Sequence, residues 1–259
     1  MKHPNLPVAL LLAALTALIL GFIARARRQS LYIRRIPGLS AVEEAVGRAV
    51  EMGRPITFSL GLGQWGQQDG IITLQALAIA VYVARLAIRY GSRVIVTMRD
   101  PIVYAVTDEA MREAYAAEGR PEAYNLDDVR FLSDRQFAYA SAMAGIILRE
   151  RAASNFMFGR FFAESLILAE AGQSAGAIQV AGTPSTTQIP FFIASCDYTI
   201  IGDEFYAGSA YLTREPVLLG SLIGQDYGKI LLLGVILLGI LVVSVYPPAA
   251  ALISQWLPG

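Results

Sequence analysis

Residue types that carry much of enzyme chemistry are nearly missing from this chain of 259 residues, which has one histidine and one cysteine. His3 lies at the extreme N-terminus, which excludes a histidine general base, a Ser-His-Asp triad and a His-ligated metal from the rest of the chain. Cys196 has no second cysteine to pair with, which excludes a disulfide framework and a cysteine-based metal site. We therefore assign no catalytic residue and no metal ligand, and we favour a protein that is not an enzyme.

Charge is scarce as well, because only 16% of the residues are charged and the mean hydropathy is +0.49. An ordinary soluble domain is less apolar, so the composition indicates an integral membrane anchor joined to a globular domain. Lys2 and Lys229 are the only lysines, and every other basic residue is arginine. Genomic base composition explains this choice, and so does the use of guanidinium groups for bidentate pairing at packed interfaces; both explanations stay open.

One cluster of basic residues lies close to the N-terminus. Beyond it the chain is acidic, because its 21 Asp and Glu residues outnumber the remaining basic ones, and an acidic body is a poor partner for nucleic acid. The cluster consists of Arg25, Arg27, Arg28, Arg34 and Arg35.

Two long apolar runs predict transmembrane helices near the two ends of the chain. Residues 8–24 contain no charge and are just long enough to cross a bilayer. The arginine cluster follows this run instead of preceding it, so we expect an uncleaved anchor with the cluster in the cytoplasm and the N-terminus outside. The second run, residues 230–246, follows Asp226 and Lys229 and leads out again. Its Gly234 and Gly239 miss the G-x-x-x-G spacing of close helix pairs.

A third apolar stretch, residues 71–88, is nearly long enough to span a membrane as well. As a span it would place Arg85, Arg89 and Arg93 outside, against the positive-inside rule, so we expect a helix buried in the domain. The expected organisation is an anchor with its basic flank over residues 1–28, a cytoplasmic domain over 29–226, and a second transmembrane helix with a short tail over 227–259. The protein would lie in a prokaryotic cell membrane with both termini outside.

Between the anchors, short apolar β-rich runs alternate with helical patterns, which predicts an α/β domain with a parallel, doubly wound, Rossmann-like sheet. Ser40 with Glu43 and Ser133 with Gln136 have capping-box spacing, and Gly53, Gly91 and Gly172 follow expected helix ends. The expected strands are 56–60, 93–98, 129–132, 156–158, 177–181 and 198–201, and the expected helices are 41–52, 74–90, 108–117, 134–152, 163–171 and 186–194.

The first expected strand is followed by a literal G-x-G-x-x-G pattern, Gly61, Gly63 and Gly66, in the strand-to-helix context of a dinucleotide site. The acidic residue expected about twenty positions further on is missing, and Asp100 is the nearest acid at a strand end. Two interpretations stay open, a nucleotide site and a glycine-rich surface loop with Trp65 packed at an interface.

The fifth expected strand is followed by Thr183, Ser185 and Thr186 ahead of an apolar helix. Hydroxyls and free amides at a helix start suit an anion, and they suit a plain helix cap equally well. Other strand ends contribute Arg99, Asp134, Arg160, Asp203 and Glu204, where the acids would hold a hard cation or act as acid and base in a hydrolase, or would simply form ion pairs.

Two features point to assembly. Small residues recur at Ala138, Ser141, Ala142 and Gly145, which would allow close helix contact, and the segment 155–162 holds four phenylalanines. Charges are sparse, so the domain has much apolar surface to bury. Either one well-filled core absorbs it, or apolar patches remain that self-association would bury.

The stretches 27–56 (RRQSLYIRRIPGLSAVEEAVGRAVEMGRPI) and 182–212 (GTPSTTQIPFFIASCDYTIIGDEFYAGSAYL) resemble an uncharacterised prokaryotic membrane-protein family, known only as a domain of unknown function. The resemblance implies the same anchor–domain–anchor layout and a membrane component of bacteria or archaea. It supplies no catalytic residues.

The sequence therefore leads to two hypotheses. The first is a membrane-anchored, non-enzymatic structural or assembly protein whose cytoplasmic α/β domain self-associates or joins a larger membrane complex. The alternative is a small-molecule or nucleotide-binding module that uses the glycine-rich loop. The expected partners are the lipid bilayer and further copies or other membrane subunits, with no nucleic acid; a cofactor, a nucleotide, enters only under the alternative.

Overall fold

The computed structural model describes residues 6–29, 37–66, 69–202, 204–213 and 215–245. The chain divides into two compact units: residues 34–213 form an α/β domain, and residues 1–33 and 214–259 together form a helical unit. Each unit is built around its own packing and is described by itself below.

The α/β domain is built on one six-stranded sheet in the order β3-β2-β1-β4-β5-β6, with every neighbouring pair parallel. This order is that of a Rossmann-type doubly wound sheet, so the predicted fold class is confirmed. The strands are β1 Ile56–Gly61, β2 Val94–Met98, β3 Val129–Phe131, β4 Ser154–Arg160, β5 Ile178–Thr183 and β6 Tyr198–Ile201.

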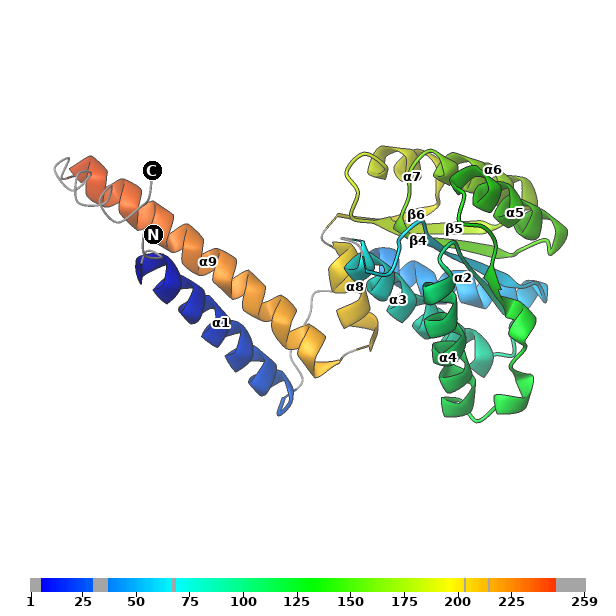
Figure 1. Ribbon diagram of the computed structural model, residues 1–259, viewed down its shortest axis with the longest axis horizontal. Coiled ribbons are helices and arrows are strands. Elements are labelled where there is room, and N and C mark those ends of the chain that lie inside the picture. Colours follow the sequence, from blue (N-terminus) through cyan, green and yellow to red (C-terminus); the bar gives the residue numbers. More distant parts are fainter. Residues whose placement is uncertain (1–5, 30–36, 67–68, 203, 214, 246–259) are drawn as a thin grey trace. The chain divides into compact units, whose positions relative to one another are not determined.

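Helices cover both faces of the sheet (Figure 1). On one face lie α2, α3, α4 and α8, and on the other lie α5, α6 and α7. The helices are α2 Pro37–Met52, α3 Gly70–Arg89, α4 Pro101–Ala117, α5 Gln136–Arg149, α6 Glu164–Ala175, α7 Ile189–Ser195 and α8 Glu204–Thr213, with the 3-10 turns η1 Pro121–Ala123 and η2 Leu126–Asp128.

All six expected strands and all six expected helices are present, but several boundaries differ. α4 begins at Pro101, seven residues before its expected start, because Asp100 caps it and proline suits the first turn. Neither capping box forms as expected, since Ser40 lies inside α2 and the Ser133 hydroxyl oxygen accepts the amide of Arg135. Helix α8 was not predicted.

The C-terminus of α6 was also placed incorrectly. Gly172 lies inside α6, and Gly176, with φ 69°, ends the helix instead. Gly172 is needed for another reason, because a Cβ there would overlap the side-chain oxygen of Gln179 on β5. Gly172 therefore permits close packing of α6 on the sheet. In the sequence alone, a glycine at this position looks like the end of a helix.

Aromatic side chains fill the core on both sides of the sheet. Phe58, Phe156, Phe158 and Phe205 pack in a row on the α3 face, with neighbouring ring centroids 5.6–6.4 Å apart. Three of the four phenylalanines of segment 155–162 are fully buried, and only Phe162 is exposed, at 39%. Most of this segment therefore belongs to a well-filled core.

The small residues of α5 have a different placement. Ala138 and Ser141 are exposed, and Ala142 and Gly145 are half-buried, so this stripe lies on the outer side of the helix within the domain. It is not part of the core, and its use in self-association stays a prediction.

Three described helices are long and apolar enough to cross a membrane: residues 8–26, 70–89 and 216–245. The second of these is α3, whose inner face, including Ile79, Val83 and Ala87, is fully buried in the domain. The expectation of a helix buried in the domain is confirmed for that face, while Ile71 and Leu74 near its start are exposed.

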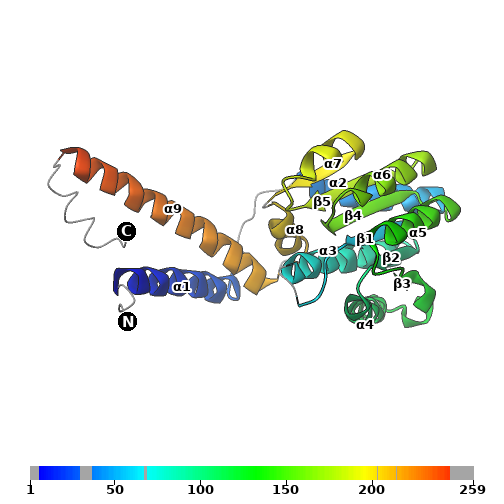
Figure 2. The same cartoon turned by 45° about the horizontal axis from the view of Figure 1, so that its top comes forward.

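The helical unit consists of α1, Leu6–Ala26, and α9, Pro216–Val245, which pack as an antiparallel pair and diverge toward the end of α9 (Figure 2). Their contact is made by glycines spaced four residues apart. A Cβ on Gly220 would overlap the Ile23 backbone, and one on Gly224 would lie 2.9 Å from Ile19 Cα. Gly228 faces Leu15 and Leu18. This G-x-x-x-G ladder was missed because it precedes the apolar run 230–246.

Within the domain, Tyr139 of α5 joins the centre of the sheet to the helix above it. Its hydroxyl lies 2.6 Å from Ser59 Oγ on β1 and 3.0 Å from Thr97 Oγ1 on β2, and the side chain is fully buried. Burial raises the pKa of Tyr139 to about 12. The hydroxyl stays neutral and satisfies two buried polar groups.

Replacing this hydroxyl tests the contribution of the network. We expect Tyr139→Phe to lower the free energy of unfolding by about 1–3 kcal/mol, because Ser59 and Thr97 lose a buried partner. The measurement is urea unfolding of the full chain in detergent, followed by far-UV circular dichroism. Tyr90→Phe, at a residue 63% exposed, is the matched control and should change the stability by less than about 0.5 kcal/mol.

Candidate functional site

The candidate site lies at the carboxyl edge of the sheet, where β1 and β4 are neighbours and their following helices, α3 and α6, cover opposite faces. Ligands of doubly wound sheets bind at this switch point. The residues that line it come from the loop 62–69, the start of α4 and the residues after β4.

The predicted glycine pattern lies here, and two of its glycines hold the loop against the rest of the domain. Gly61 has φ 70°, and a Cβ there would overlap the carbonyl group of Arg160 on β4. The amide of Leu62 donates to that same carbonyl at 2.7 Å. Gly63 lies against the Thr73 side chain of α3, whereas Gly66, with φ 85°, has nothing within 4 Å of a Cβ. The first two glycines therefore serve contacts inside the domain.

Asp100 is brought to this loop, and its carboxylate is bonded on both sides. One oxygen accepts the amides of Ile102 at 2.7 Å and Val103 at 3.4 Å, which caps α4. The other accepts the Trp65 amide at 3.1 Å, and the Asp100 residue is only 7% exposed. Its place at a strand end thus gives it a role in joining the loop to α4.

Two acids that were not singled out from the sequence belong to the same edge. Asp69 precedes α3 and forms an ion pair with Arg160 at the end of β4. Glu164, in the first turn of α6, is fully buried and accepts the Phe162 amide at 2.8 Å and the Gln136 side-chain amide at 2.5 Å. Their position directly before or inside the first turn of a helix was the signal available in the sequence.

The predicted anion site after β5 is a turn whose hydroxyls bond locally. Thr183 is fully buried, and its Oγ1 accepts the Ser185 amide at 3.2 Å. Ser185 Oγ lies 3.0 Å from Thr187 Oγ1, and Thr186 is exposed. The helix α7 begins only at Ile189, so these residues lie in the loop and turn that precede the helix and not at its start. Thr183 ends β5, and β4 lies between β5 and β1 in the sheet.

The remaining strand-end residues are scattered. Asp134 is exposed, Glu204 begins α8, and Asp203 lies outside the described residues. Arg99 follows β2, and its buried Nε is one of few buried side-chain atoms with no hydrogen-bond partner among the described residues. In the described part of the chain, no group of three or more His, Cys, Asp or Glu side chains is placed to hold a metal.

Exposed large apolar side chains are concentrated at the carboxyl edge. Ten of the fourteen exposed large apolar residues described in the domain lie in strand ends, in loops after strands or in the first two turns of the following helices. We call this set the apolar rim: Trp65, Ile71, Leu74, Ile102, Phe131, Phe137, Phe162, Leu166, Phe191 and Ile201. The other four are Tyr90, Leu126 and Leu148 at the amino edge and Ile193 within α7.

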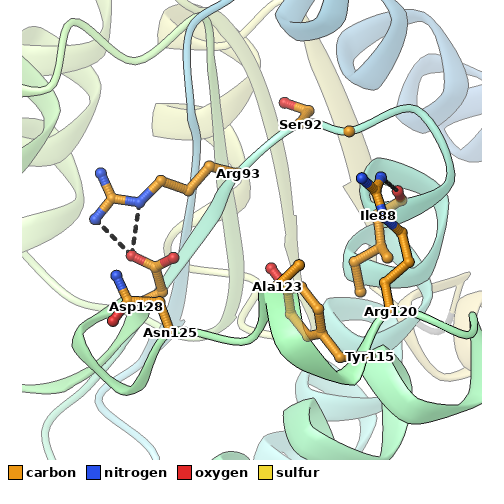
Figure 3. Close-up of a pocket in the computed structure, with 9 residues that line it drawn as sticks. Ile88, Ser92, Arg93, Tyr115, Arg120, Ala123, Asn125 and Asp128 are labelled. Carbon is orange, nitrogen blue, oxygen red and sulfur yellow. Dashed lines mark hydrogen bonds and ion pairs between the residues drawn. The ribbon is translucent and has the colours of Figure 1, made fainter.

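A cavity of about 270 Å³ lies at the opposite, amino edge of the sheet (Figure 3). Arg93 donates to Asp128 on one side at 2.7 Å, and Arg120 donates to the Ile88 carbonyl on the other side at 3.1 Å. Asp128 raises the pKa of Arg93 through this bond. These contacts join the starts of β2 and β3 and cap the end of α3, so the cavity walls serve the fold.

The predicted basic cluster is described in part. Arg25 lies in the last turn of α1, and Arg27 and Arg28 follow that helix. Arg25 and Arg28 line a hollow of about 450 Å³ beside Gly21. Arg34 and Arg35 lie outside the described residues.

Comparison with known proteins identifies the family of this chain. A family model with the description "Domain of unknown function (DUF6754)" matches residues 2–253, nearly the whole chain. No curated protein and no solved structure matches. The match confirms the predicted resemblance to an uncharacterised family.

The role of Asp100 is open to a direct test. We expect Asp100→Ala to lower the free energy of unfolding by about 1–2 kcal/mol, because it removes a helix cap and the acceptor of the Trp65 amide. Asp100→Asn keeps an acceptor oxygen and should recover most of that loss. Asp134→Ala, at an exposed residue that also precedes a helix, is the control; chemical denaturation of all three variants decides whether the capping account holds.

Proposed function

We propose that this chain, which belongs to the DUF6754 family, is a membrane-anchored assembly protein without enzymatic activity, whose α/β domain pairs with a second copy through the apolar rim. The observation that carries the proposal is the concentration of exposed large apolar side chains at the carboxyl edge. Monomeric soluble domains rarely expose such a set without a partner to cover it.

The amount of apolar surface supports a second copy as the occupant. A large apolar side chain at 40–60% exposure shows roughly 80–100 Å². The ten residues of the rim therefore offer roughly 900 Å², close to the ~800 Å² that one partner contributes to a standard protein interface. Four phenylalanines and one tryptophan among the ten rim residues also fit an interface core, where aromatic residues are enriched and charged residues are depleted.

The polar groups at the same edge support this proposal as well. Asp100, Asp69 and Glu164 are bonded within the domain, so they do not call for a charged ligand. Their effect is to keep the loops that carry Trp65, Ile102 and Phe162 in place. Loops held in this way lose little backbone entropy when a second copy covers them.

Localisation is part of the same proposal. The arginines at the end of α1 favour the cytoplasmic side, which puts the α/β domain in the cytoplasm and both termini outside a prokaryotic membrane. Anchoring at both ends confines copies to one plane and raises their effective concentration, so a modest interface suffices.

The test compares two sets of three substitutions in the full chain. The rim variant carries Ile102→Ser, Phe137→Ser and Phe191→Ser, and the control variant carries Tyr90→Ser, Leu126→Ser and Leu148→Ser at the opposite edge. The six residues have similar exposure, between 44% and 63%. Fluorescently labelled protein is reconstituted into lipid vesicles at falling protein-to-lipid ratios, and photobleaching steps are counted in each vesicle.

We expect the rim variant to dimerise at least tenfold more weakly than the unchanged chain, and the control variant to match the unchanged chain. Equal dimerisation of all three proteins would show that the rim is not the interface. A monomeric unchanged chain at every ratio would end the proposal of self-association.

A second candidate function, binding of a nucleotide or another small anion at the carboxyl edge, is favoured by one observation. The buried Nε of Arg99 lacks a partner among the described residues, and an anion at the end of β2 would supply it. The glycines of the loop and the strand order agree with this alternative, whereas the Asp69 carboxylate at the start of α3 opposes it.

Thermal-shift measurements separate this candidate from the first. Nucleotides, flavin nucleotides and inorganic phosphate at millimolar concentration should raise the Tm of the full chain if one of them binds, since bound ligand stabilises by mass action. Arg99→Gln should abolish that shift, whereas Arg112→Gln, on the outer side of α4, should leave it unchanged. No shift with any of these ligands would remove this candidate.

A further inference from the structure

An ion pair lies on the face of α9 that points away from α1. Asp226 and Lys229 are three residues apart, with 3.7 Å between the carboxylate oxygen and the ammonium nitrogen. Their side chains are 66% and 67% exposed. The buried residues of α9, Leu219 and the ladder glycines 220, 224 and 228, lie on the opposite face against α1. The contact between α1 and α9 therefore provides no partner for either charged side chain.

The glycine ladder sets the depth of this pair along α1. Gly224 faces Ile19, and Gly228 faces Leu15 and Leu18. These α1 residues lie near the middle of the candidate span 8–26, which at about 1.5 Å per residue matches a hydrocarbon core about 30 Å thick. If α1 crosses the bilayer, Asp226 and Lys229 lie close to its midplane and not at its surface.

Charges at that depth require more contacts than they make with each other. A carboxylate accepts about four hydrogen bonds and an ammonium donates three, and a single contact at 3.7 Å satisfies at most one of each. Lipid chains supply none of the others, and charged residues within membrane spans pair with one another or face the interior of a bundle. The exposed face of α9 is therefore incomplete in a single copy.

We infer that Asp226 and Lys229 pair across two copies of this chain, so that the α9 helices form a charge-matched contact inside the membrane. This inference rests on the proposed self-association and adds a second, separate interface to it. The occupant follows from charge complementarity: a surface with one positive and one negative group is complementary to itself under two-fold symmetry.

The same face of α9 continues in apolar residues with alternating spacings of four and three. Ile230, Leu233, Leu237 and Ile240 follow Asp226 at these intervals and are 57–64% exposed. Residues at this spacing form one stripe along the helix, and in a coiled coil such a stripe packs against a partner helix. The two copies have the same orientation in the membrane, so their α9 helices run parallel. Lys229 lies three residues, about 4.5 Å, further along the helix than Asp226. Each ammonium group therefore meets the carboxylate of the other copy diagonally, across two adjacent layers.

The test uses two opposite charge reversals in the full chain with an unchanged rim. Asp226→Lys gives a chain with two positive groups at this level, and Lys229→Asp gives a chain with two negative groups. Each is reconstituted alone in lipid vesicles, and the two are also mixed with different fluorescent labels. Photobleaching steps and two-colour coincidence report homodimers and heterodimers separately.

We expect each variant alone to dimerise at least tenfold more weakly than the unchanged chain, because like charges meet, and the mixture to form heterodimers within about threefold of the unchanged level. A misfolded variant would not be rescued by mixing, so heterodimer formation also reports a correct fold. Homodimers at the unchanged level in either variant would overturn the inference, and so would a mixture no better than its components.

These outcomes are distinguishable from a failure of the rim proposal. If the charge reversals have no effect while the rim variant loses dimers, the helix contact is wrong and the domain contact stands. If the charge reversals act as expected while the rim variant is unaffected, the copies meet through α9 alone.

Discussion

The close pairing of β1 with β4 at the centre of the sheet is the contact on which the rest of the domain depends. Two glycines make it possible: Gly61 approaches the Arg160 carbonyl, and Gly159, with φ 135°, approaches the Leu60 carbonyl. Any Cβ at either position would overlap backbone, so the two halves of the sheet would have to separate. The pairing continues into the loop through Leu62, and this fixes where the following residues leave the sheet.

The properties of the carboxyl edge follow from this pairing of β1 with β4. Because the loops after β1 and β4 start side by side, Asp69 reaches Arg160, and Trp65 reaches Asp100 from the next strand. The carboxylates of Asp69 and Asp100, which a ligand site would leave available, are thereby bonded within the domain. Most of the large side chains left facing outward are apolar, so the edge resembles a contact surface more than a charged binding site.

Much of the fold was predictable, because short apolar strands alternate with amphipathic helices and that pattern specifies a parallel sheet. The predictions failed where glycine or proline has a tertiary role. Gly172 packs a helix on the sheet although it resembles a helix stop, and Pro101 begins α4 although its apolar pattern becomes regular only later. The site was less predictable. Asp100 and Thr183 were predicted from their positions at strand ends. The Trp65 amide that Asp100 accepts lies 35 residues earlier, and no local pattern reveals it, whereas Thr183 bonds only to the nearby Ser185 amide and forms a local turn.

In the helical unit, composition alone was misleading about where the helices meet. The apolar run 230–246 contains Gly234 and Gly239, yet the contact with α1 uses Gly220, Gly224 and Gly228. This register matters energetically, since a charged residue at the centre of a membrane helix costs about 2.5–3.5 kcal/mol on the insertion scale. Under the proposed self-association, the pairing of Asp226 and Lys229 at that level and the covering of the apolar rim would both stabilise the dimer.

The measurement that tests self-association most directly is the mass of the unmodified chain, extracted with its surrounding lipid into polymer-bounded native discs and analysed by native mass spectrometry. Self-association gives a species of twice the 28.0 kDa chain mass, and this species persists over a hundredfold dilution. A single species at 28.0 kDa over the whole range would contradict it.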